Sequence, residues 1–215
     1  MTHQTSIETT SFAELYRSIA SALVTQYGFQ GKKTLRRCIR HYGTRLGQLR
    51  RELLIRAGQK TNLKYVFDCG WGIPCGNGAV REWTERSEQQ IRVNVLSCPF
   101  ARVWLETDHE LGHAFCEEFY PAYVKATTDP ATQVNVGKTL LNEGDEFCQF
   151  SCYLRPSNLD PQRRQVCFAE HDPLYQDRPW SDTSLGDAQR CALFLECIQQ
   201  ILHEDGLTLD LTGGI

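Results

Sequence analysis

The sequence lacks any long hydrophobic run. No stretch approaches the roughly 18 to 20 consecutive apolar residues that a helix needs to cross a bilayer. The polar beginning, MTHQTSIETTS, does not show the charged and then apolar segments of a signal peptide. We therefore expect a cytoplasmic protein that does not enter a membrane.

An excess of positive charge is also missing. The chain has 23 lysines and arginines against 26 aspartates and glutamates, a net charge of −3, so its composition gives no general affinity for nucleic acid. One local basic run, Lys32–Arg37, has a spacing that suits a helix with a solvated basic face. The alternative for this run is a surface that faces an acidic substrate.

No CxxC motif occurs, although the chain has ten cysteines. Cys69 and Cys75 are six residues apart around Gly-Trp-Gly-Ile-Pro, which is a poor spacing for a zinc knuckle. A disulfide framework is typical of small exported domains, and the sequence shows no export signal. We therefore expect reduced thiols, most of them acting as small buried hydrophobic residues.

Apolar residues recur at the helical period in two stretches near the start of the chain. The first, Ser11–Tyr27, begins with a serine that can act as N-cap and stops before Gly28. The second is expected from about Lys32 to Gly58. Gly43 and Gly47 lie inside it, and they lower helix stability unless another backbone or a ligand comes close there.

β-forming residues and alternating polarity predict five strands. They cover Asn62–Phe67, Ala79–Thr84, Gln90–Leu96, Gln133–Leu140 and Phe147–Leu154. The last two are expected to form an antiparallel hairpin around the turn Asn142–Asp145. In the third, Ile91, Val93 and Val95 are expected to face one way.

Helices at both ends, with antiparallel strands between them, predict an α+β fold in which a central antiparallel sheet is covered by N-terminal and C-terminal helices. We expect residues 1–154 to form the main domain, with a helical part (11–58) and a part that carries the sheet and the site (62–154). Residues 155–215 are expected to pack on the same domain. Short helices are expected over Pro99–Thr107 and His109–Phe119. An irregular stretch is expected over 121–130 and a long ordered loop over 155–183. A final helix is expected over Ser184–His203.

Side chains capable of nucleophilic chemistry gather between residues 97 and 152. Cys98 follows a strand and precedes a helix, where the helix dipole favours the thiolate; the alternative is a small buried residue. His109, His113 and Cys116 have helical spacing and share one face. An imidazole beside a thiol gives an activated nucleophile, unless the histidines are solvated.

Asp145 stands in a Gly-Asp turn three residues before Cys148. Its carboxylate can orient a base, or it can simply cap its own turn, which is a common place for aspartate. Cys148 and Cys152 lie on one face of a predicted strand. Alternation along that strand makes a buried structural role their default.

Four segments occur in the order RRCIRHYGTRLG, SCPFARVW, LGHAFCEEF and TLLNEGDEFCQF. Together, over roughly Phe12 to Leu154, they resemble the L-2-amino-thiazoline-4-carboxylic acid hydrolase family. The resemblance implies hydrolytic opening of a cyclic isothiourea, the 2-amino-thiazoline ring, to an N-carbamoyl amino acid. It also implies that the cysteines and the turn acid of the family correspond to Cys98, Cys116, Cys148 and Asp145.

One departure from the family follows Cys116. Members often carry an aspartate shortly downstream, whereas this chain has Glu117 and Glu118. If that acid works in the family, a glutamate with a longer reach must stand in for it here. The hairpin is also similar to 4-vinyl reductase-like sensor domains, which bind small molecules or metal.

We therefore expect a hydrolase that opens a C–N or C–S bond of a small cyclic amidine-like or isothiourea-like amino acid derivative by cysteine-based catalysis, with no metal or other cofactor. The expected catalytic residues are Cys98, Cys116, His113, Asp145 and Cys148, and the expected substrate-binding residues are Asn94, His109 and Glu118. Its expected partner is a small-molecule substrate, not nucleic acid or a membrane. Two alternatives stay open: a non-catalytic small-molecule or metal-binding module, and a zinc-dependent hydrolase.

Overall fold

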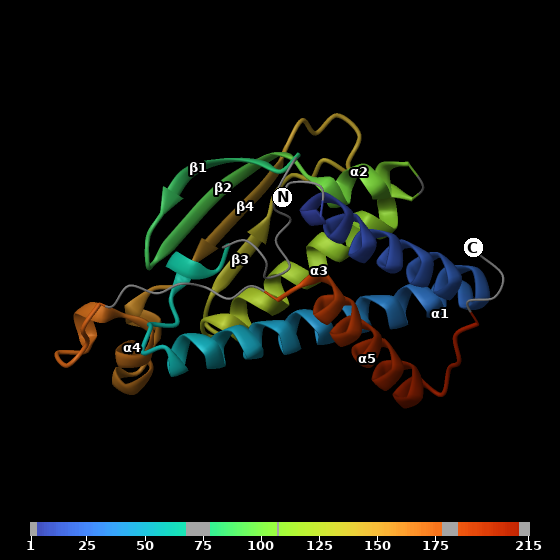
Figure 1. Ribbon diagram of the computed structural model, residues 1–215. Coiled ribbons are helices and arrows are strands. Elements are labelled where there is room, and N and C mark those ends of the chain that lie inside the picture. The colour runs from blue at the N-terminus through green and yellow to red at the C-terminus, as the bar shows by residue number, and fades with distance from the viewer. Residues whose placement is uncertain (1–3, 68–77, 107, 178–184, 211–215) are drawn as a thin grey trace.

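The computed structural model describes residues 4–67, 78–106, 108–177 and 185–210, with side chains from residue 11 onward. Its helices and strands are α1 (Gln4–Arg56), β1 (Val80–Arg86), β2 (Gln90–Ser97), α2 (Pro99–Leu105), α3 (His109–Thr127), β3 (Gln133–Val136), β4 (Cys148–Tyr153), α4 (Pro161–Cys167) and α5 (Asp187–Asp205). This is an α+β fold, as predicted (Figure 1). None of the described helices is long and apolar enough to span a membrane.

The four described strands form one antiparallel sheet in the order β1-β2-β4-β3. The pairing of β3 with β4 confirms the predicted hairpin. However, β3 ends at Val136 and not at Leu140. The reason is local: the N–H of Thr139 donates to Asp145, and the N–H of Leu140 donates to the sulfur of Cys148.

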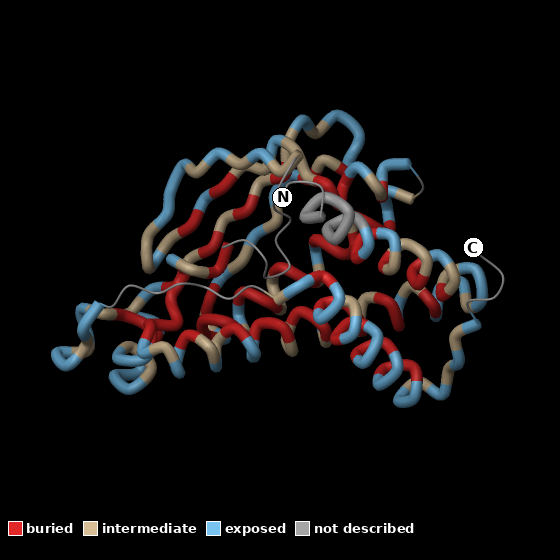
Figure 2. Tube along the Cα trace, viewed as in Figure 1, coloured by how far each residue is buried: buried red, intermediate tan, exposed pale blue. Residues whose placement is uncertain are grey.

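Alternation along the strands decides which face of the sheet is buried. Ile91 and Val93 on β2, and Phe150 and Cys152 on β4, are at most 2% exposed (Figure 2). Arg92, between two of them, is exposed. Figure 1 shows α3 lying between the sheet and α1, so the buried face is the one that meets α3. Helix α5 packs along α1.

Two glycines bring α1 and α3 into backbone contact. A Cβ atom on Gly43 would lie 2.8 Å from the carbonyl oxygen of Phe119, and one on Gly47 would lie 2.5 Å from that of Tyr123. Of the two alternatives, another backbone or a ligand, it is therefore another backbone that comes close to these glycines. Because the contact leaves no room for a side chain, it fixes where α3 lies, and α3 carries Cys116.

The predicted helix stop at Gly28 is also confirmed. Gly28 has φ 52° and ψ −124°, so α1 consists of two helices joined at a kink. A positive φ of this kind favours glycine. The predicted N-cap at Ser11 is wrong, because the helix already begins at Gln4.

Two other local predictions are wrong. Residues 62–67 do not form a strand, because the Asn62 side chain accepts a hydrogen bond from the N–H of Lys64 (3.0 Å) and caps a 3₁₀ turn over Leu63–Tyr65. The stretch 121–130 is helical as far as Thr127. Burial against α1 outweighs the hydrogen bond that Pro121 removes from α3.

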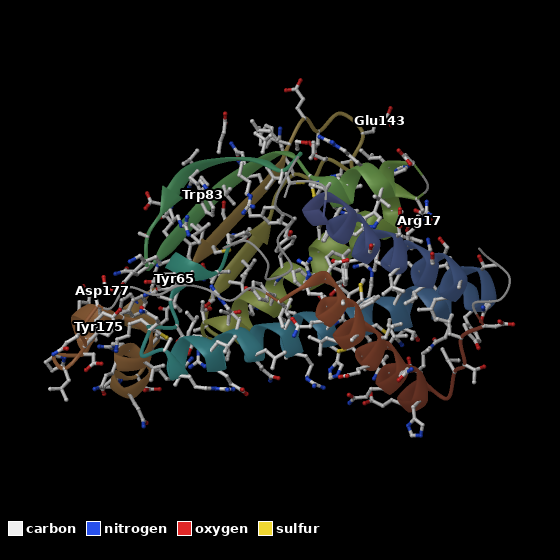
Figure 3. All side chains as sticks on the ribbon, viewed as in Figure 1. Arg17, Tyr65, Trp83, Glu143, Tyr175 and Asp177 are labelled. Atoms are coloured by element: carbon white, nitrogen blue, oxygen red, sulfur yellow. The ribbon has the colours of Figure 1, made fainter. Side chains whose placement is uncertain are left out.

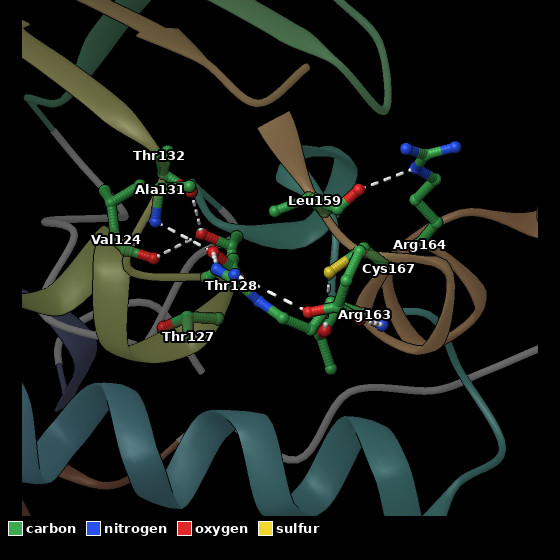
Figure 4. Close-up of polar contacts among 12 residues, drawn as sticks. Val124, Thr127, Thr128, Ala131, Thr132, Leu159, Arg163, Arg164 and Cys167 are labelled. Carbon is green, nitrogen blue, oxygen red and sulfur yellow. Dashed lines mark hydrogen bonds and ion pairs between the residues drawn. The ribbon is translucent and has the colours of Figure 1, made fainter. Parts of the chain in front are cut away.

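The segment after β4 is less irregular than the sequence predicted. It contains α4 and two 3₁₀ turns, Pro156–Asn158 and Ala169–His171, because Pro156 and Pro161 occupy first helical positions. Figure 4 shows how this segment is tied to the end of α3, with Arg163 paired to Asp129 (Nε to Oδ2, 2.9 Å). The final helix, α5, agrees with the prediction and ends at Gly206 with φ 65°.

Candidate active site

Three cysteines from separate elements line one cavity of about 30 Å³. Cys98 lies at the junction of β2 and α2, Cys116 lies on α3, and Cys148 is the first residue of β4. The cavity lining is completed by Phe67, Ala79, Arg81, Val95, Ser97, Tyr120 and Phe150. A cavity of this size holds about one water molecule.

Strand register explains how two of the thiols meet. β2 pairs antiparallel with β4, and Val95 is directly opposite Cys148. Cys98 follows Val95 by three residues, at the point where Pro99 turns the chain into α2. The pairing of β2 with β4 therefore brings Cys98 and Cys148 to the same edge of the sheet.

Helix α3 brings the third thiol over the same strand ends. Gly112 allows α2 and α3 to pack closely, since a Cβ atom there would lie 2.8 Å from Cβ of Trp104. Cys116 follows one helical turn later, 8% exposed. The position of Cys116 thus depends on glycine contacts with both α2 and α1.

Aromatic rings form the floor of the cavity. The ring of Phe67 lies 6.0 Å from that of Tyr120, 5.8 Å from Phe150 and 6.3 Å from Trp83. Trp83 is labelled on β1 in Figure 3. Such packing fixes the rings that surround the thiols and keeps most polar groups away from them.

Burial raises the pKa of all three thiols, to about 11 for Cys148 and well above its usual value for Cys116. At Cys98 the effect of burial is opposed from several sides. The N–H groups of Ala101 and Phe100, at the start of α2, favour the thiolate, and so do two guanidinium groups. Cys98 therefore has more groups that stabilise its thiolate than either neighbour.

Those guanidinium groups belong to Arg81 and Arg102. Arg81 lines the cavity from β1 and donates to the carbonyl oxygen of Phe67 (3.1 Å). Arg102 donates to Oγ of Ser97 (2.8 Å). Its guanidinium lies against Gly78, where a Cβ atom would be 3.0 Å from Nη1 and where φ is +101°. Positive charge is thus placed beside Cys98 from β1 and from α2.

His113 does not line the cavity. Its Nδ1 bonds Oγ1 of Thr139 and its Nε2 bonds Oε1 of Glu117, both at 3.0 Å. Both ring nitrogens are therefore engaged away from the thiols. The spacing of His113 and Cys116 on one helix did predict proximity, but it could not predict these partners.

Asp145 is also outside the cavity lining and serves its own turn. Its Oδ2 accepts hydrogen bonds from Nδ2 of Asn142 and from the N–H of Thr139, each at 3.1 Å. The bond from Asn142, then that from Thr139, lowers the pKa of the Asp145 carboxyl. The same loop reaches the site through Leu140, whose N–H donates to the sulfur of Cys148 (3.2 Å).

The three residues predicted to bind substrate lie elsewhere. Asn94 is on the face of β2 opposite to Val95, which lines the cavity. His109 is exposed in the first turn of α3. The carboxylate of Glu118 accepts hydrogen bonds from Arg36 (2.8 Å) and Arg40 (2.6 Å), and so joins α3 to α1.

Sequence reasoning missed Arg81 and Tyr120 in the cavity. Tyr120 follows Cys116 by four residues on a helix, so helical spacing already placed both on one face. Arg81 is directly opposite Val95 in the sheet. No pattern in the sequence gives that register, because it depends on a β-bulge in β1.

A wider hollow of about 440 Å³ lies between the end of α1 and residues 165–176. Its polar groups already pair with one another: Nζ of Lys60 donates to Asp172 (2.6 Å) and lies 4.9 Å from the centre of the Tyr175 ring, which Figure 3 labels. The hydroxyl of Tyr175 donates to Gln59 (3.1 Å). We interpret this hollow as a structural clamp on the C-terminal segment.

The sequence model of the L-2-amino-thiazoline-4-carboxylic acid hydrolase family matches residues 6–152. The chain belongs to this family. The match includes all three cavity cysteines and ends inside β4, so the C-terminal segment lies beyond it. No curated protein and no solved structure matches the chain. Among the described residues, no group of three or more histidine, cysteine or acidic side chains is arranged to hold a metal ion.

Proposed function

We propose that this hydrolase-family protein opens the ring of a small cyclic isothiourea-like or amidine-like amino acid derivative, with Cys98 as the nucleophile. The observation that carries the proposal is the convergence of Cys98, Cys116 and Cys148 on one cavity. Separate elements supply the three thiols, so adjacency along the chain does not explain their meeting.

The reaction is a two-stage substitution at the carbon between the ring nitrogen and the ring sulfur. The sulfur of Cys98 bonds to this carbon, and the thiol proton passes to the ring nitrogen. The ring C–S bond then breaks, and a proton from nitrogen goes to the departing sulfur. Water adds to the carbon, and the Cys98 thiol leaves with a proton. The product is an N-carbamoyl amino acid with a free thiol, one water heavier than the substrate.

Electrostatics favour Cys98 over the other two thiols. Its thiolate is stabilised by N–H groups of α2 and by Arg81 and Arg102. The same guanidinium groups suit a substrate carboxylate, because arginine binds carboxylates through paired N–H donors. Cys116 and Cys148 remain protonated thiols and form part of the wall.

The size of the cavity sets a condition on binding. At about 30 Å³ it holds one water molecule, whereas sites for small organic ligands are commonly several hundred Å³. A ring substrate therefore enters only when side chains of the wall change rotamer.

A second candidate function is a non-catalytic small-molecule binding module. It is favoured by the raised pKa of all three thiols, because a protonated thiol is a weak nucleophile. The two functions differ in turnover. In a binding module, the bound ligand protects the cavity cysteines from thiol reagents, and the ligand itself stays unchanged.

The test is incubation of the purified protein with 2-amino-thiazoline-4-carboxylate, with mass spectrometry for the addition of one water and a thiol reagent for the new free thiol. Cys98→Ala is expected to abolish turnover and to leave the melting temperature nearly unchanged. Cys152→Ala is the matched control, since Cys152 is fully buried on the same face of β4 and lies outside the cavity lining. It is expected to lower stability by about 1 kcal/mol or more and to spare turnover. Turnover that survives Cys98→Ala would contradict the assignment of the nucleophile.

A further inference from the structure

Tyr120 stands over the three thiols. It lies on α3 four residues after Cys116, lines the cavity and is 7% exposed. Its ring packs against Phe150 (4.5 Å between ring centres) and Phe119 (5.2 Å). The ring is therefore fixed from several sides, and the position of its hydroxyl group is fixed with it.

Tyr120 shares its cavity with all three thiols, and they act on its pKa. Burial is the first cause of the strongly raised pKa of Tyr120, and Cys116, Cys98 and Cys148 follow as further causes. Arg81 acts in the opposite direction. The phenol is therefore neutral at physiological pH, and it can act as a hydrogen-bond donor within reach of the site.

Two other buried tyrosines nearby use their hydroxyl groups in the fold, whereas the hydroxyl of Tyr42 has no partner in the described part of the chain. Tyr16 donates to the carbonyl oxygen of Leu111 (2.6 Å), and Tyr123 donates to that of Val66 (3.2 Å). Tyr120 makes no hydrogen bond with the described part of the chain. Its hydroxyl oxygen is not among the fully buried polar atoms, and no hydrogen bond within the described fold accounts for tyrosine in place of phenylalanine at this position.

The proposed reaction needs a group that moves a proton, and the described site has no imidazole bonded to a thiol. His113 is engaged by Thr139 and Glu117. We propose that Tyr120 is a further catalytic residue that relays the proton of Cys98 to the ring nitrogen of the substrate; this inference rests on the proposed function. The hydroxyl of Tyr120 gives its proton to the ring nitrogen as the S–C bond forms, and it recovers the proton from Cys98. Atoms and charge balance, because the phenol is unchanged at the end of the step.

The relay explains how a thiol that is mostly protonated can attack. Proton transfer through one intervening group needs no free thiolate before the attack. It also assigns distinct roles within one face of α3. Cys116 packs beside the nucleophile, and Tyr120, one turn later, faces the reacting atoms.

The experiment is Tyr120→Phe, which removes one oxygen atom and keeps the packed ring. Turnover of 2-amino-thiazoline-4-carboxylate is expected to fall by roughly 100-fold or more in kcat, with a much smaller change in KM. The melting temperature is expected to stay equal or to rise. Tyr123→Phe is the matched control on the same helix, because it loses a hydrogen bond to Val66; it is expected to lower the melting temperature and to spare kcat.

The outcomes separate the two proposals. If the wild-type protein turns over the substrate and Tyr120→Phe keeps kcat within about twofold, the relay is refuted and the proposed function stands. If the wild-type protein does not turn over this or a related cyclic isothiourea, both are refuted. A large loss of kcat together with a large fall in melting temperature would indicate a structural role for Tyr120 and would also overturn the inference.

Discussion

The contact of α1 with α3 at Gly47 makes a quantitative prediction for Gly47→Ala. The new Cβ atom would lie 2.5 Å from the carbonyl oxygen of Tyr123 and 2.7 Å from Cβ of Ala126. Carbon atoms in contact are ordinarily about 3.5 to 4 Å apart, so the helices must separate by on the order of 1 Å. Both nearest atoms belong to helix backbone or to a Cβ, and no rotamer change can relieve the clash.

Two opposing terms set the size of the effect. Overpacking a close contact lowers the free energy of unfolding by roughly 1 to 3 kcal/mol. Replacing glycine by alanine inside a helix raises it by about 1 kcal/mol. Since the clash is with rigid atoms, we take the upper end and expect a net loss of roughly 2 kcal/mol in the free energy of unfolding, or about 4 to 8 °C in melting temperature. Gly43→Ala, whose new Cβ atom would have its nearest contact at 2.8 Å, is expected to lower the free energy of unfolding by less.

Urea unfolding and thermal melting of the two variants measure this prediction. Gln48→Ala serves as control, because Gln48 is exposed on the same helix and its replacement is expected to stay within about 0.5 kcal/mol of wild type. Gly47→Ala is also expected to speed alkylation of Cys116, which moves with α3. A Gly47→Ala protein as stable as wild type, or less affected than Gly43→Ala, would refute the rigid-contact argument.

Two further predictions concern buried polar groups and pH. Tyr42→Phe is expected to leave the free energy of unfolding unchanged or to raise it by about 1 kcal/mol in urea titrations, because the buried hydroxyl has no hydrogen-bond partner in the described part of the chain; a loss of more than about 1 kcal/mol would contradict this. The hydrogen bond from Lys60 lowers the pKa of Asp172 below its model-peptide value of 3.8. The stability from this pair is therefore fully present above that value and is lost as pH falls through the lower, folded-state pKa. Asp172→Asn is expected to remove this part of the acid dependence between pH 5 and 2, and an unchanged profile would show that the pair contributes nothing.

Patterns of period two and 3.6 predicted most of the fold correctly, because burial enforces those periods. Ile91 and Val93 had to face the core together, and the chain had to kink at a glycine such as Gly28. The failures occur where a single side chain outweighs the pattern. Asn62 caps a turn inside a run of β-forming residues, and burial carries α3 past Pro121. Neither effect is visible in periodicity.

The candidate site divides in the same way. The meeting of Cys98 with Cys148 could be predicted, since both stand at strand ends and the two strands pair. Strand alternation already placed Asn94 on the face opposite to Val95, but no sequence pattern shows which face of β2 lines the cavity. Arg81 was missed because the register of β1 depends on a β-bulge, and no residue pattern predicts that bulge.

Position along α3, and not the face of the helix, explains why the site holds a phenol and not an imidazole. At about 100° per residue, His113 and Tyr120 lie on the same side of Cys116 around the helix, displaced from it by about 60° and 40°. They are seven residues apart, however, so about 10 Å of helix axis separates them and they meet different parts of the structure. Phe67 and Phe150, which line the cavity, pack on the ring of Tyr120. His113 instead forms a hydrogen bond with Thr139, in the loop after β3. The choice between the two candidate proton carriers is therefore made by how the β3–β4 loop lies across α3, a tertiary feature that the helix sequence does not contain.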